Sequence, residues 1–435
     1  MKTKNSAYPR FFWLALVIFG LTGQIAWVIE NMYFNVFIYK MFNASAADIS
    51  LMVSASAAAA TITTLLIGPL SDKLGKRKLF VSGGYILWGL SILGFAFIRN
   101  DVLVKIFPTL SAMSVGVTLV IIMDCVMTFF GSTANDAAFN AWLTDATEKS
   151  GRGAAEGINA MMPLVAILAV FGGFMSFDLN RAESWTTIYF IIGIAVMVIG
   201  VLGFFIIKES TEKQSSNKNY FKNIIYGFKP LVIKENKILY ILLFLFAIFG
   251  ISIQIFMPYL ILYYNVSLKM ENYVLIMAPA IILASVFTAL YGKRYDKKGF
   301  NAAIIPALTL LSVGYILLFV FKNTAAVFIG SLLMMCGYLS GMAVFGAAIR
   351  DYTPTGKAGM FQGLRIISQV LIPGILGPMI GAAVLKNAEK IVNDDGTVSF
   401  VPNENIFLFA LIFIVLLSLL LIPLFRKIKK EKENV

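Results

Sequence analysis

The chain contains twelve runs of largely apolar residues, each long enough to cross a lipid bilayer as a helix. A spanning helix needs about 20 such residues, because the hydrocarbon core is about 30 Å thick. The runs cover approximately residues 11–40, 46–70, 78–98, 109–144, 154–177, 185–207, 237–264, 271–291, 302–321, 325–349, 359–385 and 405–425. The 59% apolar content is also typical of a membrane protein. We therefore expect an all-α polytopic membrane protein with twelve transmembrane helices.

Positive charges divide the segments between these runs into two sets. Loops that follow even-numbered runs are rich in Lys and Arg, as are both ends of the chain, whereas loops after odd-numbered runs contain few cations. Lys and Arg in short loops are retained in the cytoplasm. We therefore predict a multi-pass protein of the cytoplasmic membrane with both termini in the cytoplasm. The net charge of +13 follows from this topology, so no nucleic-acid partner is expected.

The residue inventory also excludes several kinds of chemistry. The chain has no histidine, and its two cysteines, Cys125 and Cys336, lie in separate apolar runs. An imidazole proton relay is impossible, and neither a disulfide framework nor a metal cluster is expected. A nucleotide-binding glycine loop and a nucleophile with a His base are missing as well. We expect neither an enzyme nor a bound cofactor or metal.

A dense group of charges separates the second and third runs. The segment from Gly68 to Lys78 reads GPLSDKLGKRK, and such a segment cannot lie in hydrocarbon. It resembles the loop motif G-x-x-x-D-x-x-G-[RK]-[RK]-[RK] of the major facilitator superfamily, which lies between the second and third transmembrane helices. The resemblance implies that Asp72 and Arg77 form part of a cytoplasmic latch that helps to hold the outward-facing state.

The two halves of the chain repeat each other. The loop after the second run returns as GKRYDKKGF at Gly292–Phe300, and four further residues recur at one constant offset: Asp145, Thr147, Gly153 and Gly157 as Asp351, Thr353, Gly359 and Gly363. This repeat predicts two pseudo-symmetric six-helix bundles, 1–207 and 237–435, joined by a cytoplasmic linker at 208–236. The facilitator fold would place the substrate site between the bundles. We assign Asp145, Arg152 and Asp351 to the cytoplasmic gate together with the latch.

One stretch of the fourth run resembles a particular branch of the superfamily. The sequence STANDAAFNAWLTDAT at Ser132–Thr147 is similar to that of the melibiose permease-like glycoside-pentoside-hexuronide:cation symporters. In that branch an Asp three residues before a Phe binds sugar and the coupling region, which implies this role for Asp136. Asn140 falls at the position of a sugar-stacking Trp. The two carboxylates that bind sodium in the second span are replaced by Ala60 and Thr64, so we expect proton rather than sodium coupling.

Carboxylates inside the spans are candidates for cation coupling. A charge at the bilayer centre costs about 2.5–3.5 kcal/mol on insertion scales, so it is expected to face a cavity or a cation. Glu30 lies midway along the first run, and Asp136 and Asp124 lie in the fourth. Asp124 and Asp136 need not share a helix face, and Asp124 is as compatible with a structural role. A static ion pair is the alternative for Glu30.

Amides and one guanidinium within the spans are candidates for substrate binding. Gln24 and Asn31 share one face of the first helix, and Asn140 follows Asp136 by one turn. In the eleventh run Gln362, Arg365 and Gln369 are spaced to share a face. Arg365 either grips substrate hydroxyls with its two donors or extends towards the cytoplasm.

Together these features favour a secondary active transporter that imports a sugar or glycoside by alternating access, driven by a coupling cation. The alternative is a proton-coupled exporter of amphiphilic compounds, for which 19 Met and 37 Phe would form a suitable cavity. A receptor or scaffold that binds without transporting is a third class. The partners we expect are a small-molecule substrate, the coupling cation and the lipid bilayer, around a monomer.

Overall fold

The computed structural model describes residues 10–74, 76–146, 152–207, 226–270, 272–354, 358–393 and 396–433. Within these residues eleven helices are long and apolar enough to cross a membrane. A shorter apolar stretch, Met161–Phe174, forms most of the helix at the fifth predicted run. The predicted all-α polytopic membrane fold is therefore confirmed.

The chain divides into two compact units. The first comprises Met1–Phe42 and Ile62–Lys218, and the second comprises Asn43–Thr61 and Asn219–Val435. Helix α3 (Ala46–Leu74) contributes to both units because the division falls within it. The proposed bundles and linker at 1–207, 208–236 and 237–435 stay a prediction.

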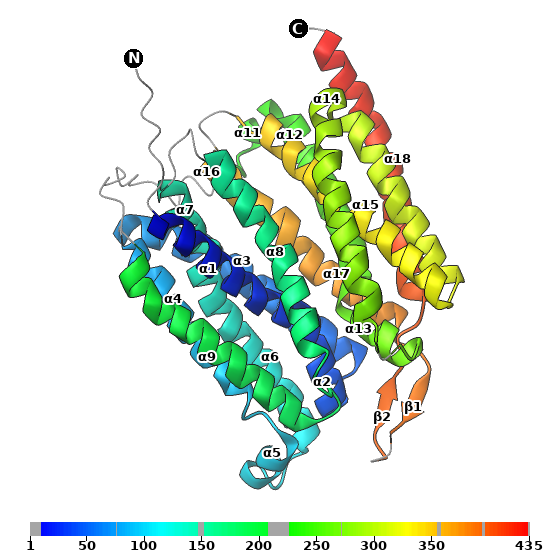
Figure 1. Cartoon of the computed structure of the whole chain (residues 1–435). Helices are drawn as coiled ribbons and strands as arrows, with labels where there is room; N and C mark the ends of the chain where they lie inside the picture. Colours follow the sequence, from blue (N-terminus) through cyan, green and yellow to red (C-terminus); the bar gives the residue numbers. More distant parts are fainter. Residues whose placement is uncertain are drawn as a thin grey trace. The chain divides into compact units, whose positions relative to one another are not determined.

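The other elements of the first unit are all helical (Figure 1). They are α1 (Arg10–Val28), η1 (Ile29–Tyr33), α2 (Phe34–Phe42), α4 (Arg77–Phe95), α5 (Asn100–Ile106), α6 (Ala112–Gly131), η2 (Ser132–Phe139), α7 (Asn140–Ala146), α8 (Arg152–Phe174) and α9 (Ala182–Ile206). Helices α4 and α9 lie side by side. A Cβ atom on Gly89 would lie 2.6 Å from the carbonyl oxygen of Gly193, so small residues let the two backbones approach closely.

The second unit contains helices and one pair of short strands. They are α11 (Pro230–Glu235), α12 (Lys237–Phe256), η3 (Met257–Tyr259), α13 (Leu260–Leu262), η4 (Tyr263–Ser267), α14 (Val274–Val320), α15 (Thr324–Tyr352), α16 (Ala358–Ile366), η5 (Ile367–Leu371), α17 (Ile372–Val384), β1 (Lys390–Val392), β2 (Val398–Phe400) and α18 (Asn405–Glu433). Helix α14 combines two predicted spans, and its two helical stretches meet at Gly299, where φ is 74°. Only a residue without a Cβ adopts this conformation readily.

The strands form an antiparallel hairpin that we predicted as a loop. Ile391 pairs with Ser399, and the turn between the strands includes Gly396 with φ of 79°. The Asn393 amide nitrogen donates to Ser399 Oγ at 2.8 Å and to Asn43 Oδ1 at 3.2 Å. These bonds attach the hairpin to the residues just before α3, within the second unit.

Candidate functional site

Two π-helical segments interrupt the spans of the first unit at the positions of two candidate carboxylates. Segment η1 contains Glu30, and η2 contains Asp136. A π turn inserts an extra residue into a helix and occurs frequently at functional sites. The sequence located both carboxylates but gave no sign of the change in helical geometry around them.

Glu30 lies buried inside the first unit with 7% of its surface exposed. Its Oε1 accepts a hydrogen bond from Thr128 Oγ1 at 2.8 Å, and Thr128 lies on α6 and is fully buried. Asp124, with 2% exposed, precedes Thr128 by one helical turn. Because residues four apart share one face of a helix, Asp124 lies on the same side of α6 as Thr128. The structure therefore gathers Glu30, Thr128 and Asp124 in one neighbourhood, here named the acidic cluster.

Asp136 has a more open environment than the acidic cluster. Its side chain is half-buried, and its Oδ2 accepts a hydrogen bond from Ser132 Oγ at 2.9 Å. Asn140 is exposed, and its Nδ2 donates to the Asp136 carbonyl oxygen at 3.2 Å. Asp136 and Asn140 thus present a carboxylate and an amide one turn apart at the junction of η2 and α7.

A chain of hydrogen bonds fixes η2 against its neighbours. Trp27 Nε1 donates to Asn135 Oδ1 at 3.4 Å, and Asn135 Nδ2 donates to the Tyr85 hydroxyl at 2.8 Å. The Tyr85 hydroxyl in turn donates to the carbonyl oxygen of Phe19 at 2.6 Å. The chain connects α1, α4 and η2. Sequence reasoning missed Tyr85 and Asn135, although an Asn beside Asp136 in an apolar run was a usable signal.

The amides of the first helix differ in exposure. Gln24 is half-buried on α1, whereas Asn31 is exposed in η1 and donates from Nδ2 to the carbonyl oxygen of Trp27 at 2.8 Å. Trp27 is half-buried, so part of its ring remains accessible. Gln24, Trp27 and Asn31 are close to Glu30 in the sequence and provide polar and aromatic side chains there.

The candidate residues of the eleventh run belong to the second unit. Arg365 lies in α16 and Gln369 in η5, and both side chains are half-buried. Gln362 also lies in α16, but its side chain falls outside the described part of the structure. Their predicted common role in substrate binding stays a prediction.

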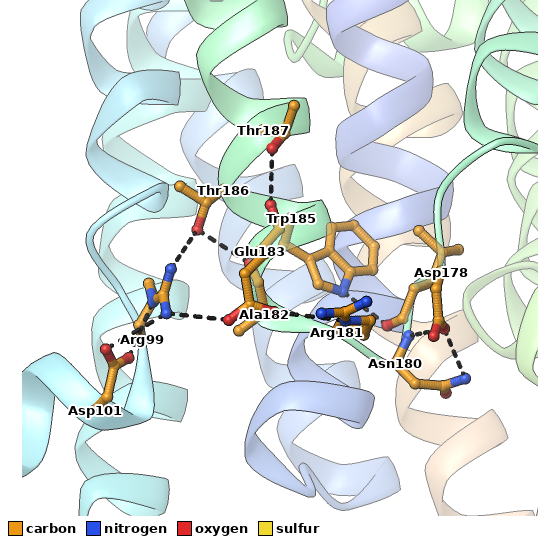
Figure 2. A network of polar contacts seen from close by, with 11 residues as sticks. Arg99, Asp101, Asp178, Asn180, Arg181, Ala182, Glu183, Trp185, Thr186 and Thr187 are labelled. Carbon is orange, nitrogen blue, oxygen red and sulfur yellow. Dashed lines mark hydrogen bonds and ion pairs between the residues drawn. The ribbon is translucent and has the colours of Figure 1, made fainter.

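A second polar group lies at one end of the first unit, shown in Figure 2. The Arg99 guanidinium donates to Asp101 Oδ1 at 2.9 Å, to Thr186 Oγ1 at 3.3 Å and to Glu183 Oε1 at 3.5 Å. The hydrogen bond from Arg99 holds the pKa of Asp101 below its usual range. Because Arg99 precedes α5 and its other partners lie on α9, this group ties the two segments together and has a structural role.

Comparison with known proteins identifies the family. Residues 12–378 match the family model of the Major Facilitator Superfamily. The chain belongs to this superfamily. It is therefore a secondary transporter rather than an enzyme, as expected from the loop motif. Comparison with curated protein sequences gave no match.

Several solved facilitator structures resemble the chain. A mutant of the nucleoside transporter NupG is 14% identical with a TM-score of 0.74, covering 95% of this chain and 100% of that one. A bacterial homologue of the human lysosomal transporter Spinster, inward-facing and unoccupied, is 16% identical with a TM-score of 0.70, covering 98% and 99%. The xylose transporter XylE from E. coli, partially occluded and inward open, is 17% identical with a TM-score of 0.67, covering 95% and 98%. At these identities the likeness shows the fold.

The superfamily loop motif is partly described. Arg77 begins α4, is buried, and donates from Nη1 to Ser71 Oγ at 2.5 Å. Ser71 Oγ donates in turn to the carbonyl oxygen of Gly68 at 2.8 Å. Asp72 lies in α3, but its side chain is outside the described part. Sequence reasoning missed Ser71, which stands immediately before the motif Asp.

The other predicted gate residues are also only partly described by the structure. Asp145 in α7 and Arg152 at the start of α8 have described backbones, whereas their side chains are not described. Asp351, in the last turn of α15, accepts a hydrogen bond from the Tyr295 hydroxyl at 2.5 Å. Tyr295 occupies the place in the repeated loop that Ser71 occupies in the first copy. In both copies this position hydrogen-bonds a predicted gate residue.

Proposed function

We propose that this transporter is a proton-coupled symporter of a sugar or glycoside in the cytoplasmic membrane. The observation that carries the proposal is the burial of Glu30 and Asp124 in the membrane-spanning part of the first unit. A carboxylate at such depth costs about 2.5–3.5 kcal/mol, and binding a proton removes the charge. Exchange of one proton in each transport cycle explains why the protein keeps a buried carboxyl despite this energetic cost.

We assign one role in coupling to the acidic cluster and another to Asp136. Glu30 carries the proton, with Thr128 Oγ1 as a donor that stabilises the ionised form at 2.8 Å. Asp124 lies one turn before Thr128 on α6, and its negative charge favours binding of the proton by Glu30. Asp136 is half-buried and binds both the substrate and the coupling region, as in the melibiose permease-like branch to which we assign the chain.

A polyhydroxylated substrate suits the amides near these acids. Gln24, Asn31 and Asn140 each present a carbonyl acceptor and two N–H donors, and their side chains are exposed or half-buried. Lipid offers no hydrogen-bond partner for the amide carbonyl oxygens of such side chains. We therefore propose that they face water and bind sugar hydroxyls together with Asp136. In the second unit we propose Gln362, Arg365 and Gln369 as substrate-binding residues.

Two fold relatives favour a substrate that carries a sugar. One relative is a nucleoside transporter and another is a D-xylose-proton symporter. A nucleoside and a pentose share the ring hydroxyls that amide and carboxylate groups bind. We propose substrates of this class, moved by alternating access in a monomer whose termini are cytoplasmic. The gate is formed by Asp72, Arg77, Asp145, Arg152 and Asp351.

The test is uptake of labelled monosaccharides, disaccharides and nucleosides into proteoliposomes, with proton and sodium gradients imposed separately. We expect uptake of at least one compound that requires the proton gradient and falls about tenfold or more in Asp136→Asn, because a charged hydrogen bond contributes about 1.5–3 kcal/mol. The control is Asp101→Asn, the same chemical change at an exposed acid outside the spans, which should transport normally. A lack of uptake under both gradients would contradict the proposal and favour export of amphiphilic compounds.

A further inference from the structure

A hollow of ≈ 900 Å³ opens at one end of the second unit. It is lined by residues around Gly299 in α14, by the last turns of α15 and by the end of the apolar part of α18. In Figure 1 the bend of α14 lies near the red, C-terminal part of α18. We call this space the basic hollow, because Lys298, Arg350 and Arg426 line it.

The three cations of the basic hollow are exposed and available to an anion. Among the described residues, no carboxylate oxygen lies within 4.0 Å of Lys298, Arg350 or Arg426. Asp296 and Asp351 also line the hollow, so its lining carries three cations and two carboxylates. The Tyr295 hydroxyl donates a hydrogen bond to Asp351 Oδ2. The lining therefore has one more cation than carboxylates, and none of its three cations forms an ion pair with a described residue.

The floor of the hollow is aromatic. Phe300 is buried, and its ring contacts that of Phe425 with centroids 6.3 Å apart. The candidate membrane spans of α15 and α18 end at Tyr352 and Arg426, both in the lining. The hollow thus lies where membrane-crossing helices leave the hydrocarbon, which is the depth of phospholipid headgroups.

An apolar stripe leads away from the cations along α18. Ile422, Leu419 and Val415 precede Arg426 by four, seven and eleven residues, a spacing that places all four on one helix face. The three apolar side chains are 46%, 59% and 51% exposed, respectively. An alkyl chain that lay along this face would begin beside the Arg426 guanidinium. A free phosphate ion has no alkyl chain to contact this apolar face.

We propose that the basic hollow binds the headgroup of an anionic phospholipid. The phosphate lies among Lys298, Arg350 and Arg426, and an acyl chain follows the apolar stripe of α18. Arginine binds phosphate oxygens with two donors, and basic pockets between transmembrane helices recognise anionic headgroups in this way. The site is separate from the acidic cluster and does not depend on the proposed transport function.

The test measures binding of short-chain phosphatidylglycerol to the purified full chain in a neutral detergent by native mass spectrometry. Phosphatidylcholine and inorganic phosphate are the comparison ligands. We expect phosphatidylglycerol to bind more tightly than either. Arg350→Gln and Arg426→Gln should each weaken its binding about fivefold, and the double variant about 25-fold, since each basic residue near a membrane surface contributes a factor of this size.

The matched control removes two cations elsewhere in the same unit, through Lys322→Gln and Lys386→Gln, and should leave binding unchanged. An equal loss in this control would overturn the proposal, because the attraction would then come from net charge. Competition by inorganic phosphate at the affinity of the lipid would also overturn it. If the double Gln variant fails to fold, Arg350→Lys with Arg426→Lys, which keeps both charges, must retain the preference for phosphatidylglycerol.

Discussion

The hydrogen bond between Thr128 and Glu30 can be tested by replacing the hydroxyl with a methyl group. Thr128→Val keeps the shape of a fully buried side chain and removes the donor that lies 2.8 Å from Glu30 Oε1. A hydrogen bond to a charged group contributes about 1.5–3 kcal/mol, whereas one between neutral groups contributes about 0.5–1.5 kcal/mol. At alkaline pH, where an exchangeable carboxyl is ionised, we expect the substitution to cost the larger amount.

The charge on Glu30 is isolated by a double-mutant cycle. In a Glu30→Gln background the acceptor is neutral, so Thr128→Val should cost about 1 kcal/mol less than in the wild type. The free energy of unfolding is measured by titration with sodium dodecyl sulfate in mixed micelles, followed by tryptophan fluorescence.

Thr133→Val provides the matched control for this cycle. The Thr133 Oγ1 atom is buried and has no hydrogen-bond partner among the described residues, so its removal should cost almost nothing. If Thr128→Val cost the same in the wild type and in the Glu30→Gln background at alkaline pH, the hydroxyl would not stabilise a negative charge, and Glu30 would not release its proton in this state.

Two further predictions concern packing and pH. In Gly84→Ala the new Cβ would lie 2.7 Å from Ala134 Cβ and 3.1 Å from its Cα, which should separate α4 from η2 and destabilise the protein by about 1–3 kcal/mol. Gly83→Ala meets no atom within 4 Å and should stay within about 1 kcal/mol of wild type in the same unfolding titration. The hydrogen bond from Arg99 lowers the pKa of Asp101 in the folded state. Ionised Asp101 therefore stabilises the folded protein above its unfolded pKa of about 4, and this stabilisation is lost as the pH falls through the lower folded pKa. Unfolding titrations of wild type and Asp101→Asn should therefore converge as the pH falls, and a constant difference would contradict this assignment.

The architecture was predictable because bilayer thickness fixes the length of a spanning helix. Apolar runs of about 20 residues can be recognised from the sequence alone, without knowing what they pack against. The charged residues of Gly68–Lys78 indicated both a loop and the superfamily. The hairpin of β1 and β2 escaped prediction because its short strands occur in a polar loop. The Asp-Asp-Gly sequence that ends at Gly396 was the available signal.

The candidate site was predictable only in part. Glu30, Asp124 and Asp136 stood out because charge is expensive within a span. Their partners did not, since a sequence does not say which helix faces meet. Thr128 is an ordinary residue of an apolar run until α6 packs beside η1, and Tyr85 is one of 17 tyrosines until its hydroxyl reaches Asn135.

The central claim is that Glu30 carries the coupled proton, and proton movement tests it most directly. Proteoliposomes loaded with a pH-sensitive dye are given a transported sugar or nucleoside without any imposed gradient, and internal acidification is recorded. We predict that the wild type acidifies the lumen on addition of substrate and that Glu30→Gln does not, although it still binds the substrate. Acidification by Glu30→Gln at the wild-type rate would contradict the account.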